Sequence, residues 1–402
     1  MTGKITTKLM LHQLIGATLL IGSIFLVIAL PSITKAAPYD HESIEQFPLN
    51  TPGGSPTAIE TDGNGSMWFG LQGSDYLGKI VSDGTIIEYP LPSGTTTIGG
   101  LTRGADGNMW FTSQDNDYVG RIRPNGTVTE FLLDAGSAPT RIVTAGNGDM
   151  WFSATGGSYI GRITSSGTVT KFPISAGSNP LAITFGPDGS IWFSATGTNM
   201  INKMSQSGIV LAAYPMLTPA SGPSEMSVGA DGRIWFNSQY EDYIGAITVS
   251  GVITEYSLSG DRAYGIANGP DGKMWFTAPT GGYVGSITTG GVISKYFVSP
   301  GSIPYAIKLG FDNNLWFTDL SGAIGKVLLE QPPDNSQSPQ ETTPAAVMPI
   351  KSGDTIPGAP NAGYGKNDVL DYGIFVAVSG VAFIAITPYV YRLLGKMQKG
   401  RH

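Results

Sequence analysis

Seven Trp-Phe pairs recur along the middle of the chain at an almost constant interval. Their tryptophans are Trp68, Trp110, Trp151, Trp192, Trp235, Trp275 and Trp316, and the successive spacings are 42, 41, 41, 43, 40 and 41 residues. A period near 41 residues built from short segments is typical of a propeller, in which each repeat forms one blade of four strands. The spacing therefore predicts an all-β fold, a seven-bladed β-propeller.

The second repeat, residues 101–132, shows the expected unit. Four short segments rich in β-branched and aromatic residues are separated by turns, and Asp106-Gly107 and Asn125-Gly126 supply the left-handed backbone of tight hairpins. An apolar residue lies nine positions before the tryptophan in every repeat: Ile59, Leu101, Ile142, Ile183, Met226, Ile266 and Ile307. This constant interval predicts the same hairpin register in all seven blades.

The two ends of the repeat array complement each other. The seventh repeat stops after Leu328 without a fourth strand, and an orphan strand, residues 44–49, precedes the first repeat and resembles residues 87–91. If this N-terminal strand completes the last blade, the ring closes without exposed sheet edges. We therefore expect one domain over residues 44–329. An open array of hairpins is the alternative, and it would leave the seventh blade with an unpaired edge.

Composition excludes several classes of function. The 402 residues include 23 Lys and Arg against 30 Asp and Glu, a net charge of -7, which leaves no basic surface for nucleic acid. The absence of cysteine excludes disulfides, thiolate zinc sites and iron–sulfur clusters. The three histidines, His12, His41 and His402, lie near the chain ends, which limits histidine chemistry in the propeller.

Apolar segments bracket the repeats and predict attachment to a membrane. Lys4 and Lys8 precede an uncharged run that ends in small residues, so residues 1–36 are expected to be a signal peptide, with an uncleaved N-terminal anchor as the alternative. Residues 372–391 form an uncharged run of 20 residues and are expected to be a transmembrane helix. Acidic residues before this run and basic ones after it place the tail, residues 392–402, in the cytoplasm and the propeller outside.

A proline-rich segment, residues 330–368, separates the repeats from the second apolar run and is expected to be an extracytoplasmic stalk. Within it, Ala359-Pro360-Asn361-Ala362-Gly363 resembles a sortase sorting signal, although two of its positions depart from the usual Leu-Pro-x-Thr-Gly. Permanent membrane anchoring is the expected arrangement, and transfer to the cell envelope is the alternative. The expected location is thus the cell membrane, as a single-pass protein.

The repeat contains Gly-Pro-Asp-Gly at 186–189 and 269–272, Ile-Gly-Arg-Ile at 160–163 and Val-Thr-Glu-Phe at 128–131. In these motifs it resembles the virginiamycin B lyase, or streptogramin lyase, family, and the resemblance covers all seven repeats. It implies a seven-bladed propeller. It also implies an elimination reaction that opens a cyclic depsipeptide, with magnesium, histidines and glutamates on one face of the ring.

The chain departs from the family at those catalytic positions. The lyase histidines lie two positions before the apolar residue of the first strand. The matching residues here are Thr57, Gly99, Thr140, Leu181, Ser224, Tyr264 and Tyr305. Ile303 and Leu320 stand where the resemblance implies glutamates, while a Tyr-Gly-Ile context survives at 264–266 in a different blade. The general base and the metal ligands that the resemblance implies are both missing, so we expect this chain to have no catalytic residue, metal or cofactor. Activity as a streptogramin lyase, or as another hydrolase or lyase, stays as the alternative.

One face of the ring carries residues suited to binding. Five tyrosines begin third strands, beside the loops that this face presents: Tyr76, Tyr118, Tyr159, Tyr243 and Tyr283. Gln114 and Gln239 adjoin them, and aromatic rings beside amides are typical of glycan and peptide recognition. Together with Tyr264 and Tyr305 these are the predicted ligand-binding residues. The alternative is that the five tyrosines cap the interior of the blades.

These observations predict a monomeric binding module, anchored in the membrane, whose partner is a glycan, a peptide or another component of the cell envelope. A rigid spacer in a surface protein is a further alternative.

Overall fold

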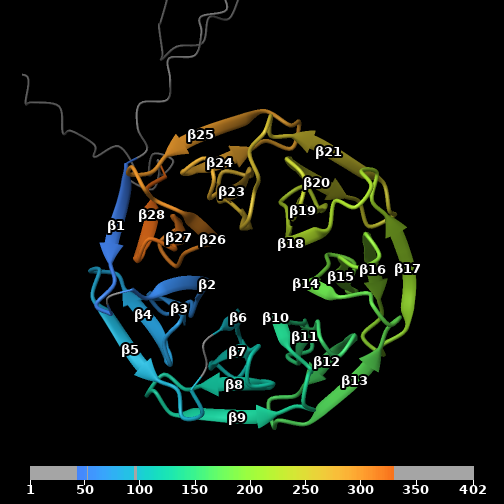
Figure 1. Ribbon diagram of the computed structural model, residues 1–402, viewed down its shortest axis with the longest axis horizontal. Helices are drawn as coiled ribbons and strands as arrows, with labels where there is room; N and C mark the ends of the chain where they lie inside the picture. The colour runs from blue at the N-terminus through green and yellow to red at the C-terminus, as the bar shows by residue number, and fades with distance from the viewer. Residues whose placement is uncertain (1–42, 52, 95–96, 330–402) are drawn as a thin grey trace, which may run out of the picture. The chain divides into compact units, whose positions relative to one another are not determined.

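The computed structural model describes residues 43–51, 53–94 and 97–329, which form seven antiparallel sheets of four strands arranged in a ring (Figure 1). Two cavities lined by the innermost strands form a channel at its centre. Blades one to seven are numbered from the sheet β2–β5. The innermost strands are β2 (Ser55–Thr61), β6 (Ile98–Arg103), β10 (Pro139–Thr144), β14 (Pro180–Phe185), β18 (Pro223–Val228), β22 (Ile266–Asn268) and β26 (Pro304–Leu309). The second strands are β3 (Ser66–Gln72), β7 (Met109–Ser113), β11 (Met150–Ala154), β15 (Ile191–Ala195), β19 (Ile234–Ser238), β23 (Met274–Ala278) and β27 (Leu315–Asp319).

The third strands are β4 (Tyr76–Val81), β8 (Tyr118–Ile122), β12 (Tyr159–Ile163), β16 (Met200–Met204), β20 (Tyr243–Ile247), β24 (Tyr283–Ile287) and β28 (Ala323–Val327). The outer strands are β1 (Ile44–Pro48), β5 (Ile86–Pro90), β9 (Val128–Leu132), β13 (Val169–Pro173), β17 (Val210–Pro215), β21 (Ile253–Ser257) and β25 (Ile293–Phe297). The predicted seven-bladed propeller is confirmed.

The N-terminal strand closes the ring. β1 pairs antiparallel with β28, from Ile44 opposite Val327 to Pro48 opposite Ala323, and it becomes the outer strand of blade seven (Figure 1). This pairing confirms the closure expected from the split last repeat. It leaves blade seven with four strands like every other blade.

The repeated register follows from how the Trp-Phe pair packs. In blade two Leu101 faces Phe111 across the ladder, and the equivalent pair faces each other in every blade. The Phe111 ring lies directly over Gly120 of the third strand, where a Cβ would approach it within 2.1 Å. Trp110 is fully buried, stacks on Phe131 of the outer strand at 5.4 Å between ring centroids, and packs against blade three.

An aspartate in the turn before the second strand holds the tryptophan in most blades. Its carboxylate accepts a hydrogen bond from the indole Nε1 four residues later, in the pairs Asp106–Trp110, Asp188–Trp192, Asp231–Trp235, Asp271–Trp275 and Asp312–Trp316. Blade three differs, because Asn147 occupies this position. There the Nε1 of Trp151 is buried without a partner among the described residues.

The predicted signal peptide, stalk, transmembrane helix and cytoplasmic tail lie outside the described residues. Within residues 43–51, 53–94 and 97–329, the structure contains no helix that is long and apolar enough to cross a membrane.

Candidate functional site

A bulge in the innermost strand determines which side chains reach the channel. In blade three, Pro139 faces Ala154 and Ile142 faces Phe152, so the inner strand has one residue more than its partner over this stretch. The same register shift occurs in six of the seven blades. Bulges turn side chains out of the regular alternation, and here they direct the residues just before the buried apolar position toward the channel.

The mouth of the channel is lined by a ring of seven residues, one from each blade. They are the seven positions two before the apolar residue: Thr57, Gly99, Thr140, Leu181, Ser224, Tyr264 and Tyr305. This mouth ring encloses, with the adjoining loops, a cavity of about 320 Å³. That volume lies within the range of small-molecule binding sites, roughly 300–1,000 Å³. No member of the ring is a histidine.

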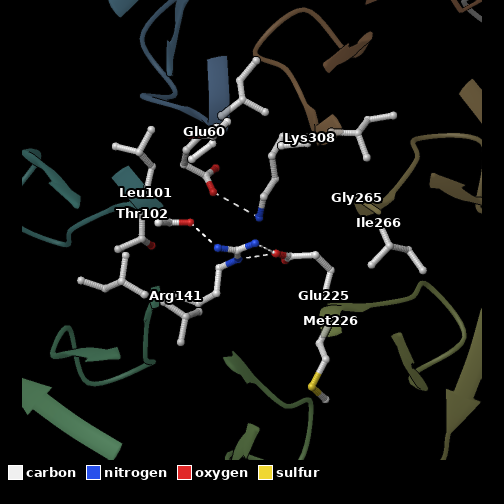
Figure 2. Close-up of a pocket in the computed structure, with 18 of the residues that line it drawn as sticks. Glu60, Leu101, Thr102, Arg141, Glu225, Met226, Gly265, Ile266 and Lys308 are labelled. Carbon is white, nitrogen blue, oxygen red and sulfur yellow. Dashed lines mark hydrogen bonds and ion pairs between the residues drawn. The ribbon is translucent and has the colours of Figure 1, made fainter. Parts of the chain in front are cut away.

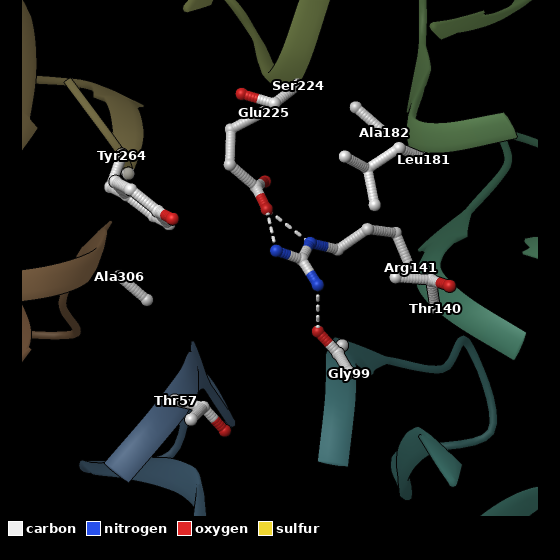
Figure 3. A network of polar contacts seen from close by, with 12 residues as sticks. Thr57, Gly99, Thr140, Arg141, Leu181, Ala182, Ser224, Glu225, Tyr264 and Ala306 are labelled. Carbon is white, nitrogen blue, oxygen red and sulfur yellow. Dashed lines mark hydrogen bonds and ion pairs between the residues drawn. The ribbon is translucent and has the colours of Figure 1, made fainter. Parts of the chain in front are cut away.

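The floor of this cavity is an ion pair between blades that are not neighbours. At the next position along the inner strands, five blades carry alanine or glycine, whereas blade three carries Arg141 and blade five carries Glu225. The Arg141 guanidinium donates through Nε and Nη2 to Glu225 Oε1, and through Nη1 to the carbonyl oxygen of Gly99 (Figure 3). The small neighbours leave the space that these two long side chains fill.

Electrostatic interactions keep Arg141 charged and the nearby Tyr305 hydroxyl neutral. Burial disfavours the charge of Arg141, but the Glu225 carboxylate outweighs it and raises the pKa of the guanidinium above its ordinary value. Burial raises the pKa of the Tyr305 hydroxyl, and the nearby Arg141 only partly opposes this. Tyr305 therefore remains a hydrogen-bond donor at neutral pH.

A second ion pair lies further along the channel. Lys308 Nζ of blade seven is 3.2 Å from Glu60 Oε2 of blade one, and Figure 2 shows both pairs pointing into the same channel. The Glu60 carboxylate, against the opposing effect of burial, raises the pKa of Lys308. Glu60 and Glu225 are the only carboxylates that line the two cavities of the described channel, and each faces a cation.

Four of the residues predicted from sequence meet at the mouth. Tyr264, Tyr305, Gln114 and Gln239 all line the cavity, and Gln72 joins them. The two tyrosine rings lie 4.7 Å apart between centroids with a 37° tilt, and Tyr264 is 40% exposed. Within the part of the chain that the structure describes, the side-chain amides of Gln72, Gln114 and Gln239 make no hydrogen bond.

The other predicted tyrosines do not line the cavity, and the prediction of ligand contact requires correction for the four of them that are buried. Tyr118, Tyr159, Tyr243 and Tyr283 are buried beneath the face. Their rings pack edge to face on the phenylalanine of the Trp-Phe pair. The hydroxyls of Tyr159, Tyr243 and Tyr283 donate inward, to Ser137, Ser221 and Asp261. These four tyrosines cap the blades, as the alternative interpretation has it. Tyr76 is 37% exposed but does not line the cavity.

The charged channel residues Glu60, Arg141, Glu225 and Lys308 were missed by reasoning from the sequence. A signal for them exists in the repeat, because they are the only charged residues directly before or after the apolar residue of the first strand. Two of them are acidic and two are basic, which already indicates pairing across a channel.

The magnesium ion implied by the family resemblance does not fit the residues at this mouth. Hydroxyls, amides and tyrosine rings line it, and its one carboxylate, Glu225, is held by Arg141. No group of three or more His, Cys, Asp or Glu that could hold a metal occurs among the described residues. The structure therefore offers no assembled set of acidic or imidazole ligands at this position.

Comparison with known proteins shows the relatives of this chain. The sequence matches the Virginiamycin B lyase family over residues 32–223 and, in an overlapping match, over residues 174–347. The structure is similar to selenomethionine-substituted virginiamycin B lyase from Staphylococcus aureus, with a TM-score of 0.68 and 32% identity over 72% of this chain and 99% of that one. A catalytically inactive form of the Staphylococcus aureus enzyme with quinupristin matches with the same values.

A streptogramin B lyase structure matches with a TM-score of 0.67 and 30% identity, over 71% of this chain and 96% of that one. No curated protein sequence matches the chain. Since the family match covers most of the chain and the solved lyases align over nearly their whole length, this chain belongs to the virginiamycin B lyase family.

Proposed function

We propose that this protein is a binding module, anchored in the membrane with its propeller outside the cytoplasm, whose ligand occupies the channel mouth. The observation that carries the proposal is a cavity of ligand size, rimmed by glutamine amides that make no hydrogen bond to the described residues and by a tyrosine pair of which Tyr264 is exposed. Polar groups that converge on a pocket without pairing among themselves are available to a ligand. A glycan, a peptide or another envelope component fits this description.

The topology can be tested because the chain has no cysteine of its own. Ser165→Cys places a thiol on an exposed turn between β12 and β13, and Gln398→Cys places one in the basic tail. A membrane-impermeant maleimide added to intact cells should label position 165 alone, and both positions after permeabilisation. Labelling of position 398 in intact cells would refute the proposed orientation.

The binding role can be tested on glycan and peptide arrays with the purified chain. The wild-type protein should retain at least one ligand that the double variant Gln114→Ala/Gln239→Ala loses. Tyr240→Ala is the matched control, because Tyr240 is 54% exposed on the same face but does not line the cavity. A ligand bound equally by all three proteins would refute this site.

Lyase activity is the second candidate function, and membership of the family favours it. Its test is incubation of the purified protein and magnesium with a streptogramin B substrate, followed by chromatography for the linear product. We expect no turnover above a buffer blank, since the positions that the resemblance assigns to histidines hold other residues. Linear product that disappears in Tyr264→Phe or Tyr305→Phe would establish the lyase function instead.

A further inference from the structure

The charge balance of the channel mouth indicates that its ligand is uncharged. This inference rests on the proposed function and concerns the class of ligand. Arg141 directs three donor groups at protein acceptors, two at Glu225 and one at Gly99. An ionic ligand would have to break this pair, and it would leave one charge of the floor without a partner. A neutral ligand can lie on the floor without disturbing it.

The tyrosine pair gives the cavity one apolar, planar wall. Tyr264 and Tyr305 come from blades six and seven, and Figure 3 shows Tyr264 on the opposite side of the channel from Arg141. An aromatic face attracts flat apolar surface and the positively polarised C–H groups of a ligand. A pyranose ring presents such a C–H face and at the same time carries hydroxyls around its edge.

The rim beside and beyond this wall suits those hydroxyls, because Gln239 of blade five and Gln72 of blade one flank the wall and Gln114 belongs to blade two. Gln72 ends β3, Gln114 follows β7 and Gln239 follows β19, so three blades place an amide at the start of the same loop. Each amide offers donors and an acceptor side by side. A sugar hydroxyl also donates and accepts at once, so neighbouring hydroxyls can satisfy both ends of one amide.

We propose that the channel mouth binds a neutral saccharide, with one pyranose ring stacked on Tyr264 and Tyr305 and its hydroxyls hydrogen-bonded to Gln114 and Gln239. The site so described takes an uncharged sugar of an oligosaccharide chain. It disfavours uronic, sulfated or sialylated sugars, whose charge has no free counterpart on the floor.

The test is calorimetric titration of the full-length protein, in detergent micelles, with a fixed panel of probes. The panel comprises hexasaccharides of glucose, mannose, xylose, galactose and N-acetylglucosamine, a galacturonic acid hexamer, and neutral hexapeptides blocked at both ends. At least one neutral hexasaccharide should bind, and the galacturonic acid hexamer should not. Tyr264→Ala should weaken the binding at least about tenfold through lost stacking, while Tyr264→Phe should retain most of it.

Loss of one amide hydrogen bond in Gln239→Ala should weaken binding about fivefold, and the neighbouring control Tyr240→Ala should not change it. Thermal melting of each variant shows whether it is folded. Peptide binding that is lost in Tyr264→Ala, without saccharide binding, would overturn the saccharide assignment and leave the binding function standing. Saccharide binding unaffected by Tyr264→Ala and Tyr305→Ala would overturn the site. No binding by any probe would overturn the assignment and count against the binding function as well.

Discussion

Exchanging two residues in the turn of blade three should stabilise the propeller. Blade two has Asp106-Gly107-Asn108 before its second strand, whereas blade three has Asn147-Gly148-Asp149, with the carboxylate two positions later. The Nε1 of Trp110 consequently donates to Asp106 at 3.1 Å, and the Nε1 of Trp151 has no partner among the described residues. The double variant Asn147→Asp/Asp149→Asn restores the arrangement of blade two.

The size of the effect follows from the unsatisfied indole. A buried donor without a partner costs about 1–3 kcal/mol, and an ionised acceptor strengthens the new bond. We expect a gain of about 1–2 kcal/mol, toward the lower end, because the acceptor lies in a partly exposed turn. The exchange does not change the net charge of the protein. Arg162, whose Nε lies 3.8 Å from Asp149 Oδ2 in the wild type, can pair with the new carboxylate at position 147. For a domain of this size the gain corresponds to a rise in Tm of roughly 2–3 °C.

Differential scanning calorimetry of the wild type and the variants measures this rise. The matched control is the reverse exchange in blade two, Asp106→Asn/Asn108→Asp, which should lower the Tm by a similar amount. The single variant Asn147→Asp should gain less, because it loses the 3.0 Å bond from Asn147 Nδ2 to Asp149 and places two carboxylates together. If neither exchange moved the Tm, the aspartate would not stabilise the tryptophan, and the reasoning would be wrong.

Further predictions concern the closing strand, acid stability and the channel floor. Deleting residues 37–50 removes β1 and should strongly lower the Tm and cause aggregation on size-exclusion chromatography, because blade seven then has an open edge. Burial opposes ionisation of Asp312, but hydrogen bonds from Lys326, Trp316 and Asn314 outweigh it and lower its pKa below 3.8. The stabilisation of the fold by the ionised Asp312 carboxylate is therefore present above pH 3.8 and is lost as the pH falls below that value. The Tm of Asp312→Asn should consequently fall less steeply toward pH 3 than the Tm of the wild type. Glu225→Gln leaves Arg141 without its countercharge and should lower the free energy of unfolding, measured by urea denaturation, by about 1–2 kcal/mol, a figure reduced because the pair is partly exposed. The double variant Arg141→Met/Glu225→Met should recover most of this loss.

The fold could be predicted from the sequence because its determinants recur at fixed intervals. The interval from Ile59 to Trp68 repeats in every blade, and it sets the register that the structure confirms. The split last repeat likewise predicted the pairing of β1 with β28. Both features depend on backbone pairing and burial, which a periodic pattern expresses directly.

The candidate site could be predicted only in part, because whether a tyrosine at the start of a third strand is buried depends on a partner from another segment of the chain. The repeat position predicts Tyr264 and Tyr305, which do line the cavity, whereas the loop pattern places Tyr159 and Tyr243 at the surface although their hydroxyls form hydrogen bonds inside the blades. Their partners, Ser137 and Ser221, each precede the tyrosine by 22 residues. Each serine lies in the connection that precedes its blade, and each tyrosine begins the third strand of that blade. The burial of these tyrosines is therefore indicated in the sequence only by a serine–tyrosine pair that recurs at this interval in more than one repeat.

The bulge in the innermost strands explains why family membership identifies the fold more firmly than the reaction. The framework residues, such as Trp151 and Phe152, pack inside and between blades, so a change there disturbs the propeller. The mouth ring lies outside the regular ladder, and its seven members face the channel rather than the core. Leu181 and Tyr305, for example, fall within the register shift of their strands and line the cavity. An exchange at such a position changes what the cavity can bind or catalyse. The proposed binding site of this chain is accordingly the mouth ring together with the floor beneath it, where Arg141 and Glu225 fill the space left by small neighbours.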